Sequence, residues 1–109
     1  MKKINVATAN FTTRDKFNIK VSKSLKDAVG EKLTILKACV GEDVDKDNNE
    51  VRAAAFITDK GAYSSISSTV IDCVDDLIDM IDDGEENITV MVEERTSNSN
   101  RDYLVLTLV

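Results

Sequence analysis

The sequence predicts a single, mainly β domain with one α-helix. Its length of 109 residues fits one domain with a modest core. Several short segments alternate apolar with polar residues, the pattern of strands with one buried face. Only one stretch, between residues 64 and 84, repeats apolar side chains at helical spacing. No run of about 18 apolar residues occurs, so we expect no membrane span.

Six segments are predicted as strands because they are rich in β-branched or aromatic residues and end at Gly, Asn, Asp or Ser. They are Lys3–Ala9, Phe17–Val21, Leu33–Val40, Val51–Thr58, Ile88–Val92 and Tyr103–Leu108. An acidic loop at 41–50 joins the third strand to the fourth, and Asn98–Asn100 supplies a hairpin turn before the last strand.

The predicted helix follows the tight turn Asp59-Lys60-Gly61. Ser64 or Ser65 suits the N-cap, because a serine hydroxyl can accept a hydrogen bond from a free backbone N–H. Gly84 stands where a C-terminal cap belongs. One apolar stripe connects the two ends and consists of Ile66, Val70, Val74 (or Cys73), Leu77, Ile78 and Ile81.

Without the first strand, the order of elements is strand, strand, strand, helix, strand, strand. This is the order of the oligonucleotide/oligosaccharide-binding (OB) barrel, whose helix lies between the third and fourth strands. We therefore expect an OB-like antiparallel barrel of five or six strands that forms one domain over residues 1–109. Other small α+β sheets share this order.

The composition argues against an enzyme, a metal site or a cofactor. The chain has no histidine, and its four glycines match no phosphate-binding loop. Asp43-Val-Asp45-Lys-Asp47 resembles the opening of a calcium loop, but Asn48 replaces the required glycine and Ala54 the bidentate glutamate. Cys39 and Cys73 lie in apolar runs and are expected to be free thiols in a reducing compartment. No secretory signal is apparent at the start, so we expect a cytoplasmic location.

Charge divides the chain into two parts. Residues 1–37 carry nine cations and three acids, whereas residues 38–109 carry five cations and seventeen acids. This asymmetry predicts a basic face, compatible with nucleic acid, and an acidic face. The alternative is that the charges scatter evenly over the surface.

Basic and aromatic residues together suggest a site for single-stranded nucleic acid, which is held by cationic grooves and by rings that stack on bases. The candidate residues are Tyr63, Phe56, Lys60, Arg52, Lys37, Lys20, Arg95, Arg101 and Tyr103. Phe11 and Phe17 are further candidates, although Phe17 shares its predicted strand face with Ile19 and Val21.

One stretch resembles the single-stranded-DNA-binding proteins of the protein-primed Bacillus phages, the phi twenty-nine group. The shared pattern consists of Phe56, Asp59, Gly61, Tyr63-Ser64, Ile66-Ser67, Thr69-Val70 and Asp76-Leu77-Ile78-Asp79. The resemblance implies an OB-like barrel, non-specific coating of single-stranded DNA during replication, and contact between Tyr63 and DNA. This chain lacks the family's further tyrosines in the region matching residues 38–52.

Two functions follow as hypotheses. The first is single-stranded DNA binding during replication, without a cofactor, with replication proteins as a further class of partner and no membrane. The second is an acidic module or inhibitor that docks a basic protein through the aspartates of the Asp72–Asp83 helix face. The sequence leaves open whether the protein is a monomer or a small homo-oligomer.

Overall fold

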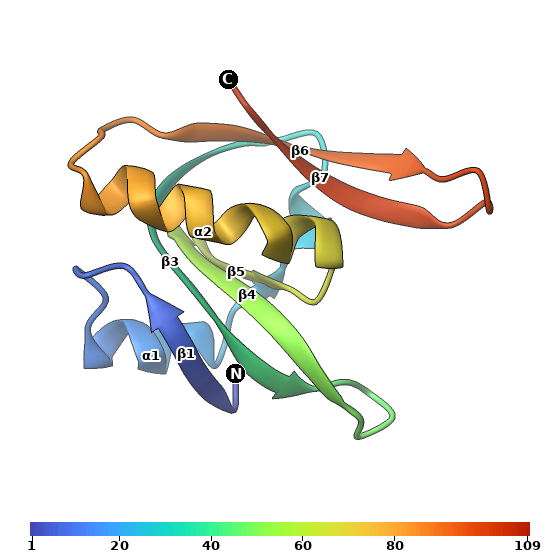
Figure 1. Ribbon diagram of the computed structural model, residues 1–109, viewed down its shortest axis with the longest axis horizontal. Coiled ribbons are helices and arrows are strands. Elements are labelled where there is room, and N and C mark those ends of the chain that lie inside the picture. Colours follow the sequence, from blue (N-terminus) through green and yellow to red (C-terminus); the bar gives the residue numbers. More distant parts are fainter.

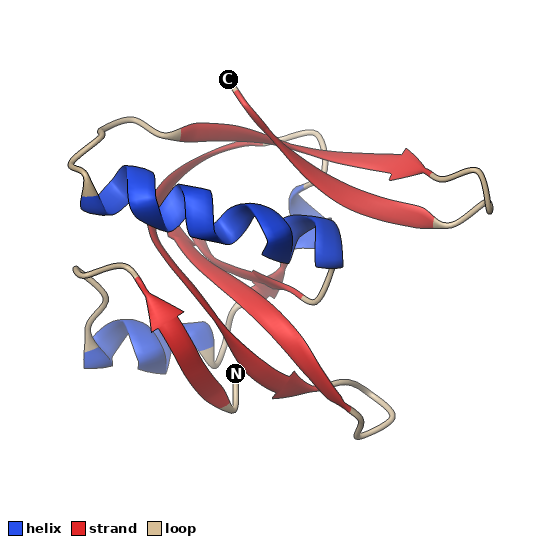
Figure 2. Cartoon of the chain, in the orientation of Figure 1, coloured by secondary structure: helices blue, strands red, loops and turns tan.

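The computed structural model describes all residues from 1 to 109. It is mainly β, with two α-helices and one short 3-10 turn (Figures 1 and 2). In chain order the elements are β1 (Lys3–Ala7), α1 (Thr13–Ile19), β2 (Lys23–Ser24), η1 (Leu25–Ala28), β3 (Lys32–Val44), β4 (Glu50–Thr58), β5 (Gly61–Ser65), α2 (Ser68–Asp82), β6 (Thr89–Thr96) and β7 (Asp102–Leu108). Neither helix combines the length and the apolar character that a membrane span needs.

The strands form one curled, mixed sheet in the order β2-β5-β4-β3-β6-β7, and β1 pairs separately with β3. All pairs are antiparallel except β2 with β5. The thirteen residues of β3 make it the central strand, because β1 and β4 pair with residues 39–42 from its two edges and β6 pairs with residues 32–34. The result is a half-barrel around α2 (Figure 1).

The expected OB-like barrel is therefore seen in part. The order β3, β4, β5, α2, β6, β7 has three strands, one helix and two strands as predicted, but β5 takes the place of the strand predicted at Phe17–Val21. The sheet is not closed, because β5 pairs with β2 on its free side and β7 remains an edge. A second helix, α1, also lies outside the predicted plan.

The main core lies between the half-barrel and α2. Eighteen buried residues form it, including Phe56 and Tyr63 from the sheet and Val70, Val74 and Leu77 from α2. The hydroxyl of Thr69 donates a 2.6 Å hydrogen bond to the Leu104 carbonyl, which ties the start of α2 to β7. The predicted apolar stripe therefore faces the interior, with the exception of the exposed Ile66.

A smaller core lies on the other face of the same strands. Ile19 of α1 packs there with Cys39 and Ala55. Cys39 and Ala55 are paired in register, whereas Phe56 and its partner Ala38 belong to the main core. Because neighbouring residues on a strand point to opposite faces, α1 and α2 cover opposite sides of β3 and β4 (Figure 2).

The two cysteines are free and contribute to different clusters, Cys39 to the smaller and Cys73 to the edge of the main one. Burial raises the pKa of the Cys39 thiol to about 11, with hydrogen bonding at Ala55 opposing the shift. Burial also raises the pKa of Cys73, and the nearby charges of Asp76 and Asp72 raise it further. Both thiols are accordingly poor nucleophiles.

The prediction of a strand at Phe17–Val21 is wrong, because Thr13–Ile19 is a helix. A capping box starts it. Thr12 accepts a hydrogen bond from the Asp15 backbone N–H, and the Asp15 carboxylate accepts one from the Thr12 N–H. Asp15 and Ile19, four residues apart, are the two buried residues of the helix, so its packing has helical rather than strand periodicity.

The long helix starts later than predicted. Ser64 and Ser65 belong to β5, and Ser67 occupies the N-cap position. At the other end Gly84 has φ +89°, and its N–H bonds to Ile81 while that of Glu85 bonds to Met80. These two hydrogen bonds form a Schellman motif, so the expected cap at Gly84 is confirmed.

Candidate nucleic-acid interface

The nine residues predicted to contact nucleic acid do not form one patch. Phe56 and Tyr63 lie side by side on β4 and β5, but they are 0% and 5% exposed in the main core. The Lys23 ammonium lies 5.8 Å from the centroid of the Tyr63 ring. In this conformation neither ring presents a face on which a base could stack.

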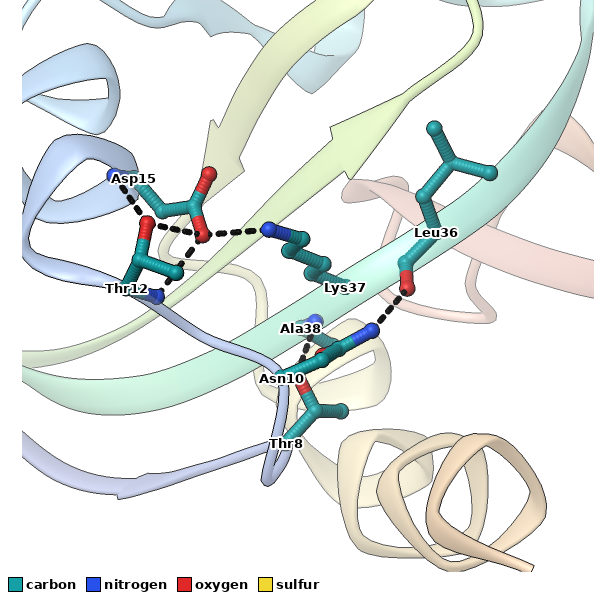
Figure 3. A network of polar contacts seen from close by, with 7 residues as sticks. All are labelled: Thr8, Asn10, Thr12, Asp15, Leu36, Lys37 and Ala38. Carbon is teal, nitrogen blue, oxygen red and sulfur yellow. Dashed lines mark hydrogen bonds and ion pairs between the residues drawn. The ribbon is translucent and has the colours of Figure 1, made fainter. Parts of the chain in front are cut away.

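Lys37 is held in a structural network (Figure 3). Its ammonium donates a 2.7 Å hydrogen bond to the Asp15 carboxylate, which also accepts from the backbone and hydroxyl of Thr12. Burial alone would raise the pKa of Asp15, but the hydrogen bonds from Lys37 and Thr12 and the charge of Lys37 bring it below its ordinary value. The network fixes α1 against β3, so Lys37 is not free to bind phosphate.

The remaining predicted cations are on the surface. Lys60 lies 3.6 Å from Glu31, and Arg95 lies 3.8 Å from Glu93. Exposed pairs of this kind contribute little to stability, about 0–1 kcal/mol, so both cations can exchange their partner for a phosphate. Three more predicted cations are exposed and have no carboxylate within 4.0 Å; these are Lys20, Arg52 and Arg101.

A shallow groove runs across the end of β5 toward β7. We call it the serine groove. Its first part, of about 330 Å³, is lined by Ser22, Ser24, Asp43, Ala53, Ser64, Ser65 and Ile66. Its second part, of about 390 Å³, is lined by Ser24, Lys26, Ser65, Ile66, Ser67, Ser68, Glu94, Asp102, Tyr103 and Leu104. The two parts share Ser24, Ser65 and Ile66, so they form one continuous surface.

The serine groove contains one of the predicted residues, the half-buried Tyr103. The side chain of Ile66, 57% exposed, offers a second apolar surface there. The groove crosses β5 and reaches β7, which correspond to the third and last strands of an OB barrel. OB folds bind oligonucleotides on the face of their second and third strands and at the adjoining loops.

A second groove, of about 400 Å³, lies between β1 and α1. We call it the lysine groove. Its lining consists of Met1, Lys2, Lys3, Ile4, Thr13, Lys16, Phe17, Ile19 and Lys20. Of these residues, Lys20 and, as a further candidate, Phe17 were predicted from the sequence. The missed signal was the spacing of Lys16 and Lys20, which share a helix face only once α1 is recognised as a helix.

The six aspartates of α2 and its C-terminal cap, from Asp72 to Asp83, are all exposed. One of them has a structural contact, because the Asp82 carboxylate accepts a 2.9 Å hydrogen bond from the Ala9 N–H. This face lies on the side of the sheet opposite α1.

The structure is thus a half-barrel that carries a polar groove and a groove lined by four lysines. Comparison with known proteins gives the family. The sequence model described as "Phage Single-stranded DNA-binding protein" matches residues 2–109. The chain therefore belongs to this family of the phi twenty-nine group, and the resemblance seen at Phe56–Asp79 is confirmed. No curated protein and no solved structure matches the chain.

Proposed function

We propose that this protein binds single-stranded DNA, without reading its sequence, during phage DNA replication in the bacterial host. The observation that carries the proposal is the family match over residues 2–109. The docking module that would engage a basic protein through Asp72–Asp83 is not favoured, because the family is defined by binding to DNA.

The mechanism is capture without a chemical step. Lysine and arginine side chains neutralise phosphates and release condensed counterions, so affinity falls as salt rises. The strand lies in the serine groove, where hydroxyl groups donate to phosphate oxygens and Tyr103 stacks against a base. Arg95 does not line the groove, but it is directly opposite Tyr103 on β6, so it extends from the same face and can contact a phosphate beside the groove.

Tyr63 supports this surface from beneath rather than by direct stacking. Its ring lies in the core under β5, and Lys23 covers the ring from the solvent side. Ser64 and Ser65, the next two residues, line the groove.

The test is a titration of a labelled oligo-dT with wild type, Tyr103→Ala and Tyr103→Phe, followed by fluorescence anisotropy at several salt concentrations. Wild type should bind, with an affinity that falls with salt. Tyr103→Ala should weaken binding by about 1–3 kcal/mol, and Tyr103→Phe should retain it, because phenylalanine keeps the stacking ring. Wild type that does not bind oligo-dT would refute the function, whereas an unchanged affinity for Tyr103→Ala would remove only this residue from the site.

A further inference from the structure

We propose that the lysine groove is a second contact surface for the same DNA strand, with its lysines on the phosphates and Phe17 as a stacking ring. This inference rests on the proposed function and extends it to residues outside the serine groove.

The need for a second surface comes from charge. The serine groove is lined by one cation, Lys26, and three acids, Asp43, Glu94 and Asp102. Lys26 itself lies 3.9 Å from Glu94. A polyanion in this groove would therefore meet more negative than positive charge, and the cations that neutralise its phosphates must come from elsewhere.

The lysine groove has the opposite lining, with four lysines and no acid. None of the four ammonium groups has a carboxylate within 4.0 Å. Ten of the 14 basic residues lack such a partner, so the distinguishing feature of the groove is that four of them line it together without an acid. The acid nearest in sequence, Asp15, is directed to Thr12 and Lys37 instead. The groove therefore keeps its positive charge available for an external anion.

The clustering is unfavourable for the isolated protein. Lys16 and Lys20 stand four residues apart at the end of a short helix, where like charges repel each other. Lys2 and Lys3 add two more like charges across the groove. A bound phosphate backbone would relieve this repulsion between the four ammonium groups.

Phe17 supplies the apolar part of the groove. Its ring is 68% exposed, and the Lys20 ammonium lies 6.0 Å from the ring centroid. The buried Asp15 and Ile19 anchor the same helix, so the ring is held outward by a fixed backbone. A cation beside an exposed ring is the combination with which single-strand binders hold one nucleotide.

The two grooves adjoin and can form one path. Lys20 lines the lysine groove, and Ser22, two residues later, lines the serine groove. The amino group of Met1 in the lysine groove is 3.4 Å from the carboxylate of Asp43 in the serine groove. A strand that leaves the lysines can therefore continue over the serines to Tyr103.

The first experiment compares the double variant Lys16→Ala/Lys20→Ala with Lys32→Ala/Lys46→Ala. The control removes the same charge from exposed lysines outside both grooves. The slope of log affinity against log salt for oligo-dT should fall by about 1.4 in the groove variant, since each phosphate contact on a single strand contributes about 0.7. At 0.1 M salt this corresponds to a loss of affinity on the order of 20-fold. The control variant should leave both the salt slope and the affinity at 0.1 M salt nearly unchanged.

The second experiment tests the ring. Phe17→Trp introduces the only tryptophan of the chain. Its fluorescence should be quenched by oligo-dT and restored by salt. Phe17→Ala should lower affinity about tenfold at an unchanged melting temperature, because the side chain is exposed. Leu108→Ala, which truncates an equally exposed apolar residue on β7, is the control and should bind as wild type does.

The outcomes separate the two proposals. If wild type binds oligo-dT but both the lysine and the Phe17 variants bind equally well, the lysine groove is not part of the site and the proposed function stands. If the lysine variants lose no more affinity than their control, charge in this groove is not used. If wild type does not bind single-stranded DNA, the proposed function falls, and this inference with it.

Discussion

Asp15 shows how one side chain can connect two elements. Its carboxylate accepts a hydrogen bond from the Thr12 N–H, which completes the capping box of α1, and another from the ammonium of Lys37 on β3. The residue is also buried. All of these contacts favour the ionised form, which is why its pKa lies below the ordinary value despite burial. The residue therefore couples the stability of the α1 layer to pH.

We predict that Asp15→Asn lowers the free energy of unfolding at pH 7 by about 1.5–3 kcal/mol, the range for hydrogen bonds to a charged group. A group with a depressed folded-state pKa stabilises fully above its unfolded pKa, 3.8, and loses this contribution as pH falls through that value toward the folded one. The difference between wild type and the variant should therefore narrow below about pH 4.

Urea unfolding between pH 7 and pH 3 measures this difference. The control is Asp47→Asn, because the exposed carboxylate of Asp47 makes no hydrogen bond or ion pair. The free energy of unfolding of this variant should equal that of wild type at every pH. A gap between wild type and Asp15→Asn that stayed constant to pH 3 would contradict the assignment of the shift to these contacts.

At the scale of elements, the close approach of β1 to β3 depends on Gly41. A Cβ at this position would overlap the carbonyl oxygen of Lys3 and lie 2.9 Å from the Cα of Ile4. Both are backbone atoms of β1, so no side-chain rotation can relieve the contact. The glycine is required for space, since its φ is not positive.

We predict that Gly41→Ala destabilises the protein by about 1–3 kcal/mol or more and displaces β1, because overpacking forces a backbone shift. Displacement of β1 also moves Lys2 and Lys3, so affinity for oligo-dT should fall under conditions where the variant remains folded. Thermal melts and DNA titrations measure the two effects.

Gly30→Ala is the control for this substitution. Gly30 has φ +86°, but nothing lies within 4 Å of its added Cβ. It should lose about 1 kcal/mol of stability from backbone strain and keep its affinity for DNA. Equal affinity in Gly41→Ala and wild type would show that the position of β1 does not affect binding.

Much of this element order could be predicted from the sequence, because β6, β7 and α2 carry a clear periodicity and β3 and β4 contain strand-forming apolar runs. The segment around α1 could not. Phe17, Ile19 and Val21 alternate as a strand would, and only the Thr12–Asp15 capping box indicates a helix. β5 was missed because its serines resemble the N-cap of the helix that follows.

The candidate site was harder to predict than the fold. The sequence places Arg52 and Phe56 on one face of β4 and Ala53 and Ala55 on the other, as in the structure. The sequence cannot show that other elements cover both faces of β4. The face that carries Phe56 is covered by α2, and the face that carries Ala55 is covered by α1 and β1. Phe56 and Tyr63 therefore lie in the core, whereas Phe17, assigned to an apolar strand face, is on the surface.

Across the whole molecule, charge is separated by the sheet. The lysine groove lies on the side of α1, and the exposed aspartates of α2 lie on the opposite side. The protein can thus carry a net charge of −6 and still present a positive surface to a polyanion. At 0.15 M salt the field of the aspartates is screened over about 8 Å, which limits its effect on the distant groove.

We predict that Asp75→Asn/Asp79→Asn changes affinity for oligo-dT less than about twofold at 0.15 M salt and raises it modestly at low salt, where screening is weaker. The same change should stabilise α2 by a few tenths of a kcal/mol, since it removes acids from the C-terminal half of a helix. Anisotropy titrations at two salt concentrations test the first effect, and thermal melts test the second. Loss of DNA binding in this variant would place α2 in the interface.

The shared use of β3 has a consequence for the cost of binding. One uninterrupted backbone pairs with β1, which bears Lys2 and Lys3, and with β4 and β6, whose neighbours β5 and β7 carry the serines and Tyr103. The spacing of the contact points that we propose for DNA is thus set before the ligand arrives. The entropy lost on association then falls mainly on the flexible DNA rather than on the protein, as in other pre-organised receptors.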